Sequence, residues 1–416
     1  MRQPARDRPM VIVGAGLAGG NAAVTLREEG FGGRIVLIGP EPGIPFGRPP
    51  LSKTYLRSEE DLDDWYVRPR GWYDEHEVQR LPRNAVALDA AAHAVMLDGG
   101  QVLEYGKVLV ATGGRNRRLE VPGAELAGIH YLRTVAESEA IKQEAAVHRR
   151  AVVVGMGFIG CEVAASLAQL GVGVTAIFPG RVPLERVLGP EVGAAVAALH
   201  RAKGVELLAG DQIVSFEGTE RVQAAVTAGG RRVECDFVVA GVGIEPELPS
   251  LAGSSVAQSN GLLVDEGCRA SAPDVYGAGD VANHLHPVFG RVRVEHFNNA
   301  EKQGRAAARA MLGSPAPYDY IHTFWSDQYE HKLEYVGHAT QWDAFVVRGS
   351  VEDRRLLGFY LRDGLLQAAV GLDRGGDPEL DHDGEMAACA RLVAQRARPA
   401  PDRLADEGRD LGSLVD

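Results

Sequence analysis

Two glycine-rich motifs in this chain have the spacing that binds the pyrophosphate of a dinucleotide. Each follows a short apolar run and precedes a helical stretch: Gly14-x-Gly16-x-x-Gly19 and Gly155-x-Gly157-x-x-Gly160. The glycines permit a tight turn, let the backbone approach the phosphates and allow helix and strand to pack closely. Free N–H groups at the helix start then favour the negative charge of the phosphates. One copy alone could be a structural turn, but two copies in equivalent contexts predict two dinucleotide sites.

Small residues end two further apolar runs, where a bulky side chain would obstruct a cofactor. They are Ala111-Thr112-Gly113-Gly114 and Ala278-Gly279-Asp280. Asp280 can accept a hydrogen bond from a ribityl hydroxyl of a flavin; the alternative is the N-cap of a following helix, and both roles are compatible. Two dinucleotide sites in one chain indicate a flavin next to a nicotinamide.

The motifs belong to a regular alternation of predicted strands and helices. Short Val- and Ile-rich runs that end in glycine indicate buried parallel strands, at residues 11–20, 108–114, 152–160, 275–280 and, more weakly, 238–243. Helical stretches lie between them, at residues 20–29, 160–170 and 190–201. This alternation predicts an α/β protein with two doubly wound, Rossmann-type domains.

The sequence after about residue 320 indicates a smaller antiparallel domain. Aromatic residues alternate over residues 323–337, residues 345–348 and 356–361 form two further apolar runs, and Asp363-Gly364 is a hairpin turn signal. The last segment, 398–416, is rich in proline and charge, and we expect an extended tail there.

Length, charge and cysteine content exclude several classes of protein. The 416 residues suffice for more than one core, and the hydrophobic (45%) and charged (24%) fractions are those of ordinary globular proteins. The net charge of −12 disfavours binding to nucleic acid or an anionic membrane. Four scattered cysteines form no C-x-x-C pair, so we expect neither a metal cluster nor a redox dithiol. Without a leader pattern or a long apolar run, the sequence predicts a soluble cytoplasmic protein.

Several motifs, in order along nearly the whole chain, resemble the ferredoxin reductases of oxygenase systems, the putidaredoxin reductase and rubredoxin reductase group. The motifs are Arg48-Pro49-Pro50-Leu51-Ser52-Lys53, Gly155-Met156-Gly157-Phe158-Ile159-Gly160-Cys161-Glu162, Tyr276-Gly277-Ala278-Gly279-Asp280, Glu295-His296-Phe297-Asn298-Asn299 and Phe324-Trp325-Ser326-Asp327-Gln328-Tyr329. The resemblance implies electron transfer from NADH or NADPH through FAD to a [2Fe–2S] ferredoxin. It also implies an FAD-binding domain at 1–116 and 247–321, an NAD(P)-binding domain at 117–246 and a C-terminal α+β interface domain at 322–416.

The same resemblance implies three residues that act at the flavin. Lys53 and Glu162 are expected to pair beside the flavin ring, where the cation favours the anionic reduced form. Trp325 is expected to form an aromatic wall beside the ring. The alternatives are a surface lysine, a glutamate favoured by the dipole of its helix, and an ordinary core tryptophan. Disulfide reductases of the same superfamily place a redox cysteine where this chain has Ser52, which excludes thiol chemistry there.

Further binding residues are carried over from the family motifs. For FAD they are Gly14, Gly16, Leu17, Ala18, Gly19, Glu41, Arg48, Lys53, Ala111, Thr112, Gly113, Arg133, Gly279, Asp280, Glu295, His296, Phe297 and Trp325, with Gln303 as a further contact. For NADH or NADPH they are Gly155, Gly157, Phe158, Ile159, Gly160, Glu162, Arg181, Arg186, Gly241, Val242 and Gly243. No metal site is expected: Asp381-His382-Asp383 offers ligand types, but a solvated loop is the better interpretation.

Three departures from the family pattern bear on specificity. Phe178 ends the second predicted strand of the coenzyme motif, where an acidic residue should bind the adenosine 2′-hydroxyl. Arg181 or Arg186 could instead bind a 2′-phosphate, so NADH and NADPH both remain open. Phe297 replaces a tryptophan, which keeps a ring but removes a donor. The loop at 371–384 is altered and acidic, in the domain expected to border the electron acceptor.

An acidic ferredoxin would need a local basic patch on this acidic chain. Candidate sources are Arg115, Arg117, Arg118, Arg291, Arg293, Arg305 and Arg309, although an ordinary solvated face is the alternative for each. Two other functions remain open. One is a small-molecule reductase for quinone or monodehydroascorbate-like acceptors. The other is a redox-sensing flavoprotein resembling apoptosis-inducing factor, which Phe178 favours. Either a monomer or a homodimer is expected.

Overall fold

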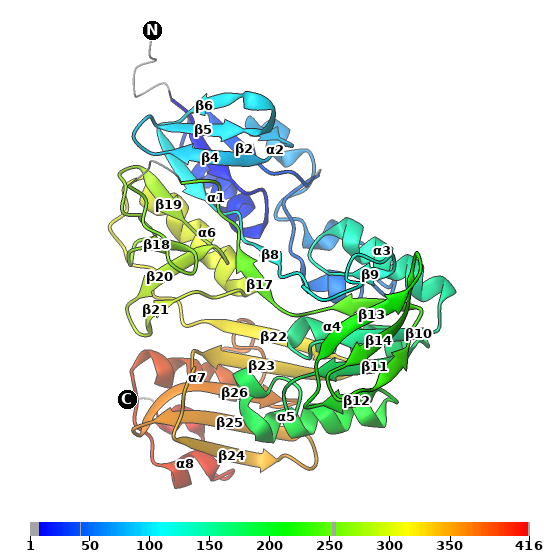
Figure 1. Ribbon diagram of the computed structural model, residues 1–416. Coiled ribbons are helices and arrows are strands. Elements are labelled where there is room, and N and C mark those ends of the chain that lie inside the picture. Colours follow the sequence, from blue (N-terminus) through cyan, green and yellow to red (C-terminus); the bar gives the residue numbers. More distant parts are fainter. Residues whose placement is uncertain (1–7, 42, 252–254, 415–416) are drawn as a thin grey trace. The chain divides into compact units, whose positions relative to one another are not determined.

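The chain forms two compact units (Figure 1). The computed structural model describes residues 8–41, 43–251 and 255–414. Unit 1 takes its described residues from 1–48, 62–115 and 244–322, and unit 2 from 49–61, 116–243 and 323–416. Each unit contains a five-stranded parallel sheet with helices packed on it, so the predicted α/β class is confirmed.

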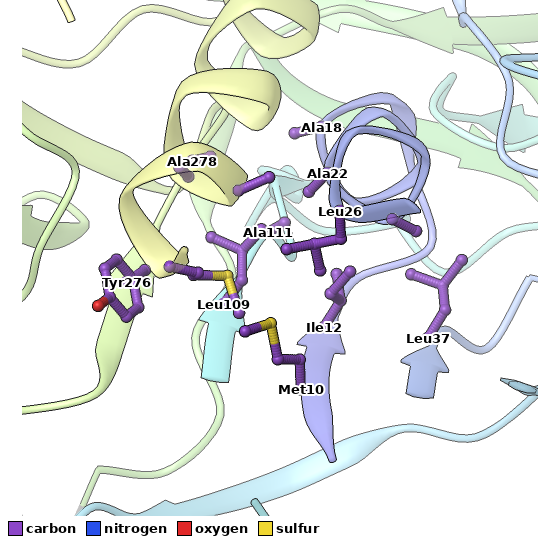
Figure 2. Close-up of a cluster of buried hydrophobic side chains, with 14 of the residues drawn as sticks. Met10, Ile12, Ala18, Ala22, Leu26, Leu37, Leu109, Ala111, Tyr276 and Ala278 are labelled. Atoms are coloured by element: carbon purple, nitrogen blue, oxygen red, sulfur yellow. The ribbon is translucent and has the colours of Figure 1, made fainter. Parts of the chain in front are cut away.

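The parallel sheet of unit 1 carries the first glycine motif. Its strands, in spatial order, are β19 (Val275–Gly277), β7 (Lys107–Val110), β1 (Met10–Val13), β2 (Ile35–Ile38) and β3 (Val78–Leu81). Helices α1 (Leu17–Glu28) and α6 (Phe297–Met311) pack on one face, where Ala18, Ala22 and Leu26 meet Ile12 and Leu109 of the strands (Figure 2). β1 and β2 are buried along their whole length, which explains their continuous apolar runs.

A second layer covers the other face of this sheet. The antiparallel strands β4 (Ala85–Asp89), β5 (Ala94–Leu97) and β6 (Val102–Glu104) contribute Leu88 and Val95 to a core shared with Val11 and Val13 of β1. Unit 1 also contains α2 (Trp72–Glu75) and the sheet of β18 (Leu262–Val264), β20 (Ala282–His286) and β21 (Gly290–Val292). β8 (Gly114–Asn116) pairs with β17 (Ile244–Pro246).

The parallel sheet of unit 2 carries the second glycine motif. Its strands, in order, are β12 (Glu206–Ala209), β11 (Gly173–Phe178), β10 (Arg150–Val154), β16 (Phe237–Ala240) and β9 (Ile129–His130). Its helices are α3 (Val135–Val147), α4 (Phe158–Gln169) and α5 (Glu185–Ala202), and a capping box of Thr134 and Glu137 starts α3. An antiparallel sheet of β13 (Ile213–Gly218), β14 (Val222–Thr227) and β15 (Arg232–Glu234) packs against one face.

The end of unit 2 is an antiparallel sheet, as the alternating aromatic residues predict. Its strands, in order, are β22 (Thr323–Gln328), β23 (His331–Gly337), β26 (Leu365–Leu372), β25 (Arg355–Arg362) and β24 (Ala344–Ser350), and α7 (Glu385–Ala394) packs on it. Asp363 and Gly364 both have a positive φ, of 50° and 75°, and form the two-residue hairpin between β25 and β26.

The prediction of an extended tail at 398–416 is wrong for the residues that the structure describes. Helix α8 (Pro401–Ala405) and a turn of 3-10 helix (Leu411–Leu414) bury Leu404 and Leu411 almost completely. Arg348 of β24, itself 3% exposed, donates hydrogen bonds of 2.7 Å to the carbonyl oxygens of Asp406 and Arg409. Proline and charge density therefore misled the prediction, because a remote buried arginine fixes this segment. Within the described residues, no helix has the length and apolarity needed to cross a bilayer.

Candidate functional site

The first glycine motif begins directly after β1, in unit 1. Gly14 has a φ of +117°, and a Cβ there would lie 2.1 Å from the carbonyl oxygen of Ala111. A Cβ on Gly19 would lie 1.9 Å from the carbonyl oxygen of Gly14, so the first turn of α1 packs directly on the strand end. At Gly16, by contrast, a Cβ would meet nothing within 4 Å. The open space at the N-terminus of α1 fits a phosphate group.

The end of β19 lies close to the start of α1. The N–H of Gly279 donates to the buried side chain of Gln303 at 2.9 Å, and a Cβ on Gly279 would lie 3.1 Å from that of Ala18. Asp280 follows and is 9% exposed. A turn and then β20 come after it, so the alternative role of Asp280 as a helix N-cap is wrong. Asp280 stays a predicted acceptor for a ribityl hydroxyl of the flavin.

The other FAD candidates near the motif lie on helix starts and loops. Leu17 and Ala18 form the first turn of α1. Glu41 lies in the loop after β2 and accepts a hydrogen bond of 2.7 Å from Arg48. Sequence reasoning placed both residues at the FAD without foreseeing that they pair with each other.

The end of β7 is built of small residues, as predicted. Ala111, Thr112 and Gly113 follow this strand, and Gly113 has a φ of +69°. The hydroxyl of Thr112 donates to the backbone carbonyl of Glu247. That hydrogen bond fixes the chain after the strand end, so Thr112 has a positioning role whatever else it contacts.

The predicted motif around residue 296 forms the start of α6. His296 is the N-cap residue and Phe297 the first residue of the helix. The Phe297 ring meets Trp65 edge-on, with centroids 5.9 Å apart, and Glu295 pairs with Arg293 at 2.6 Å. The phenylalanine that replaces the family tryptophan is thus held in an aromatic contact of unit 1.

The second glycine motif repeats the geometry of the first, in unit 2. Gly155 has a φ of +90°, and a Cβ there would lie 2.5 Å from the carbonyl oxygen of Gly241. A Cβ on Gly160 would lie 1.9 Å from the carbonyl oxygen of Gly155, whereas at Gly157 it would meet nothing within 4 Å. The N-terminus of α4 therefore has the same open space as that of α1, and no side chain caps it. We call the open space beside Gly16 and that beside Gly157 the two glycine cradles.

The neighbours of this cradle are the remaining coenzyme candidates. Gly241, Val242 and Gly243 follow β16, the strand beside β10. In the first turn of α4, Ile159 keeps 44% of its surface exposed. Phe158 instead packs edge-on against Phe324 of β22, with centroids 4.9 Å apart, so its ring joins α4 to the antiparallel sheet.

The loop after β11 and the start of α5 contain the two arginines predicted as candidates for binding a 2′-phosphate. Phe178 ends the strand and is 4% exposed, so it packs in the core and offers no polar group. Arg181 forms an ion pair with Glu185, in which Nε and Oε1 lie 2.7 Å apart. Arg186, in the next position of α5, is exposed. One of the two candidate arginines is thus already paired with a carboxylate.

Lys53 and Glu162 lie together in a buried ion pair, with Nζ and Oε2 2.7 Å apart. Their side chains are 10% and 3% exposed, so the surface-lysine alternative is wrong. Two hydroxyls donate to the same carboxylate: Ser52 to Oε2 at 2.5 Å and Ser326 to Oε1 at 2.7 Å. The ammonium also donates to the carbonyl oxygen of Pro49, at 3.3 Å. A fully bonded carboxylate thus fixes the position of one buried cation.

A chain of side-chain hydrogen bonds continues from this pair. Gln328 donates to Ser326 at 3.3 Å, and its Oε1 lies 3.1 Å from Nε2 of His200. Because an amide oxygen only accepts, His200 is protonated on Nε2, and its Nδ1 accepts from the hydroxyl of Tyr329 at 3.2 Å. Burial lowers the pKa of His200 to about 4. The imidazole is therefore neutral at physiological pH.

Trp325 and Asp327 are on the face of β22 opposite to Ser326. Both are partly exposed, while Phe324, Ser326 and Gln328 are buried. Burial raises the pKa of Asp327, although Lys53 and Lys332 oppose this, and its side chain hydrogen-bonds to Trp325.

The FAD candidates are divided between the two units. Lys53, Arg133 and Trp325 belong to unit 2, and the other FAD candidates belong to unit 1. Arg133 directly precedes the capping box of α3.

The four cysteines are all free and buried. Burial raises the pKa of Cys235, Cys268 and Cys389 to about 12, and that of Cys161 well above its usual value. None of these thiols forms a thiolate near neutral pH. Within the described ranges, no group of three or more His, Cys, Asp or Glu side chains could hold a metal ion.

Most of the arginines considered for a basic patch already have carboxylate partners. Arg115 pairs with Glu245, Arg293 with Glu295, Arg305 with Glu301 and Arg309 with Glu29, all within 2.8 Å. Arg118 lies over the ring of Tyr131, and Arg291 donates to the carbonyl oxygens of Val264 and Asn283. These pairs reduce the positive charge that the clusters can present to a partner.

Sequence reasoning missed Ser52 and Ser326 as partners of Glu162, and Glu185 as the partner of Arg181. Ser326 could have been found from its place next to Trp325 in a predicted strand, because neighbouring side chains of a strand point to opposite faces of the sheet. The signal for Glu185 was its spacing of four residues from Arg181 at the start of a helix.

The comparisons with known proteins identify the family. Residues 8–304 match the family model described as pyridine nucleotide-disulphide oxidoreductase, and residues 323–415 match the reductase C-terminal domain. The chain belongs to the pyridine nucleotide-disulphide oxidoreductase family.

Relatives within the pyridine nucleotide-disulphide oxidoreductase family match nearly the whole chain. Rhodocoxin reductase of Rhodococcus erythropolis is 36% identical, over 97% of this chain and 93% of that protein. The ferredoxin–NAD(+) reductase component of the biphenyl dioxygenase system of Paraburkholderia xenovorans is 35% identical, over 98% of both. A structure of the covalent putidaredoxin reductase–putidaredoxin complex superposes with a TM-score of 0.92 at 33% identity, over 98% of both chains. The predicted resemblance to these reductases is confirmed.

The two cradles fit the cofactor and coenzyme of the family. In both motifs the first and third glycines are required by close backbone contacts, whereas Gly16 and Gly157 face open space at a helix N-terminus. This geometry fits the pyrophosphate of FAD in unit 1 and that of the nicotinamide coenzyme in unit 2.

Proposed function

We propose that this protein passes electrons from a nicotinamide coenzyme, through FAD, to a [2Fe–2S] ferredoxin of an oxygenase system, either a cytochrome P450 or a Rieske oxygenase. The observation that carries the proposal is the pair of glycine cradles combined with Ser52 at the redox-thiol position. Ser52 is 2% exposed and bonded to Glu162, and the cysteines are buried with raised pKa values. Reduction by a side-chain dithiol is therefore no competing route.

Each part of the site has a proposed task in this function. The cradle of α1 binds FAD, and the cradle of α4 binds the coenzyme. When bound, FAD supplies the exchange between a two-electron hydride donor and a one-electron acceptor. Lys53 holds a positive charge for the reduced flavin, Glu162 fixes the ammonium, and Trp325 shields the ring.

We further propose three domains, with residues 1–116 and 247–321 binding FAD, 117–246 binding the coenzyme and 322–416 contacting the acceptor. The separate matches of residues 8–304 and 323–415 to two family models support a boundary before the last domain. A cytoplasmic location is proposed because the four cysteines are free and buried, which suits a reducing compartment.

Anaerobic reduction tests the proposed function. The FAD-loaded protein is mixed with NADH or NADPH while flavin absorbance is followed, and a panel of [2Fe–2S] ferredoxins is then added. We expect coenzyme to bleach the flavin and at least one ferredoxin to be reduced catalytically. Turnover with quinones but with no ferredoxin would instead identify a small-molecule reductase.

A further inference from the structure

The loop that follows β11 is fixed against the second glycine motif. β10 and β11 pair in parallel, with Val154 opposite Ile177, so both strands end at the same edge of the sheet. The N–H of Gly155 donates to the carbonyl oxygen of Ile177, and that of Leu184 to the carbonyl oxygen of Met156, both at 2.9 Å. The segment 178–185 therefore lies beside the coenzyme cradle, where a Rossmann fold selects the adenosine ribose.

The acidic residue that normally makes this selection is absent. Phe178 occupies the strand end and its side chain is buried in the core. A lost carboxylate together with a nearby arginine is the usual pattern for binding a 2′-phosphate. Taken alone, Phe178 and Arg181 would therefore indicate NADPH.

The contacts of Glu185 argue against a preference for NADPH, because this residue binds Arg181 in two ways. Its Oε1 accepts from the guanidinium, with distances of 2.7 Å to Nε and 2.5 Å to Nη2. Its Oε2 accepts from the backbone N–H of Arg181 at 2.8 Å. A 2′-phosphate would need these same donors. Even if the exposed guanidinium turned away, the backbone hydrogen bond would keep the carboxylate at the loop, where it repels the phosphate.

We propose that Glu185 makes this protein prefer NADH to NADPH, by occupying the donors of Arg181 and placing a negative charge beside the adenosine ribose. This inference rests on the proposed function only in that unit 2 binds a nicotinamide dinucleotide. Glu185, at the start of α5, thus selects NADH over NADPH in place of a carboxylate at the position of Phe178.

Binding measurements on the oxidised, FAD-loaded protein test the inference. Isothermal titration gives the dissociation constants of NAD+ and NADP+ for the wild type, Glu185→Gln, Arg181→Ala and the double variant. Glu191→Gln is the matched control, because it removes the same charge from an exposed position of the same helix. Thermal unfolding of each variant shows that the loop change leaves the fold intact, and Glu185→Ala is a second substitution at the site.

We expect the wild type to bind NAD+ more tightly than NADP+. Glu185→Gln should tighten NADP+ binding about tenfold and change NAD+ binding less than twofold, since one repulsive charge is removed and one arginine released. Adding Arg181→Ala should abolish that gain, whereas Glu191→Gln should leave the preference unchanged. Arg181→Ala alone leaves the carboxylate of Glu185 without its cation, so it should keep or strengthen the preference for NAD+.

Three results would overturn the inference: a wild type that prefers NADP+, equal effects of Glu185→Gln on both coenzymes, or a tenfold gain of NADP+ affinity in Arg181→Ala alone. Failure of the proposed function gives different results. A wild type that binds neither coenzyme contradicts both proposals, whereas the expected binding shifts without any ferredoxin reduction contradict only the proposed acceptor.

Discussion

The hydroxyl of Ser326 donates a 2.7 Å hydrogen bond to the carboxylate of Glu162, across 164 positions of the chain. Glu162 lies in the helix of the second glycine motif, and Ser326 in the first strand of the C-terminal antiparallel sheet. The same carboxylate accepts from Ser52 and pairs with Lys53. The carboxylate of Glu162 thus joins three segments of unit 2 that are far apart in the chain. The loss of stability on removing one partner depends on the bonds that the remaining partners keep.

Removing Glu162 should destabilise the protein more than removing Lys53. Glu162→Ala removes the carboxylate that lies against the buried ammonium and leaves its hydrogen bond to the carbonyl oxygen of Pro49, and breaking a buried ion pair in this way costs about 3–5 kcal/mol. Lys53→Met leaves the carboxylate with two hydroxyl donors, so we expect a smaller loss, roughly 1–2 kcal/mol.

Urea unfolding, followed by tryptophan fluorescence, measures both losses. The double variant should recover part of the loss of Glu162→Ala, because it removes both charges. Equal losses in the two single variants would show that the hydroxyls do not hold the carboxylate.

Ser326→Ala should lower the free energy of unfolding by about 2 kcal/mol, because a hydrogen bond to a charged acceptor is lost and the amide of Gln328 loses an acceptor. Ser326→Thr keeps the hydroxyl and should recover most of the loss. Urea unfolding of both variants checks this. Flavin reduction by NADH, followed by stopped flow, should also slow in Ser326→Ala and return with Thr if the hydroxyl positions the Lys53–Glu162 pair. An unchanged rate would restrict Ser326 to a structural role.

The parts of the fold that the sequence predicted are those set by local patterns. β1 and β10 are buried apolar runs, and Gly14 and Gly155 adopt backbone angles that favour glycine, so the strand–turn–helix units follow from short segments. Asp363 and Gly364 fix their hairpin in the same way. Such features need no knowledge of remote contacts.

The parts that sequence reasoning missed depend on contacts between remote residues. Leu404 lies in a segment rich in proline and charge, yet it is fully buried under a chain end that Arg348 holds through hydrogen bonds spanning 58 and 61 positions. Arg305 and Arg309 suggested a basic face, but Glu301 and Glu29 pair with them. The pairing of Lys53 with Glu162 came from a family resemblance, since the two residues lie far apart in the chain and no local pattern links them. Charge and polarity along a chain do not show which partner neutralises a group.

Acid should destabilise the protein through His200. Its folded pKa is about 4, because the ring is buried, and its unfolded pKa is about 6.5. Between these values the unfolded chain binds the proton and the folded one does not, so stability falls as pH drops from 6.5 toward 4. The full contribution is about 3 kcal/mol.

Urea unfolding at pH 7 and pH 5 measures this effect. His200→Asn should show a smaller fall in stability between the two pH values than the wild type, and the exposed His382→Asn serves as the control. Burial also lowers the pKa of His284 to about 4. Because both variants retain His284, it contributes equally to the pH dependence of stability in all three proteins. Identical pH dependence in all three proteins would contradict the assignment.

The glycines of the coenzyme cradle should divide into structural and binding positions. Gly155→Ala places a Cβ 2.5 Å from the carbonyl oxygen of Gly241, at a φ of +90° that side chains rarely adopt. We expect a loss of about 2–4 kcal/mol in stability from this clash and backbone strain, visible as a lower midpoint in urea. Gly157→Ala adds the same methyl group where nothing lies within 4 Å, so we expect a loss of about 1 kcal/mol or less, from alanine at the N-cap position of α4.

Gly157→Ala should impair coenzyme binding although it leaves the fold intact. The methyl group of Gly157→Ala projects into the space assigned to the pyrophosphate, so NAD+ affinity should fall at least tenfold, or about 1.4 kcal/mol, in a protein that unfolds normally. Gly16→Ala tests the first cradle in the same way, with FAD retention during gel filtration as its measurement, because its Cβ also meets nothing within 4 Å. A stable Gly157→Ala variant that binds NAD+ like the wild type would show that the open space beside α4 does not receive the coenzyme.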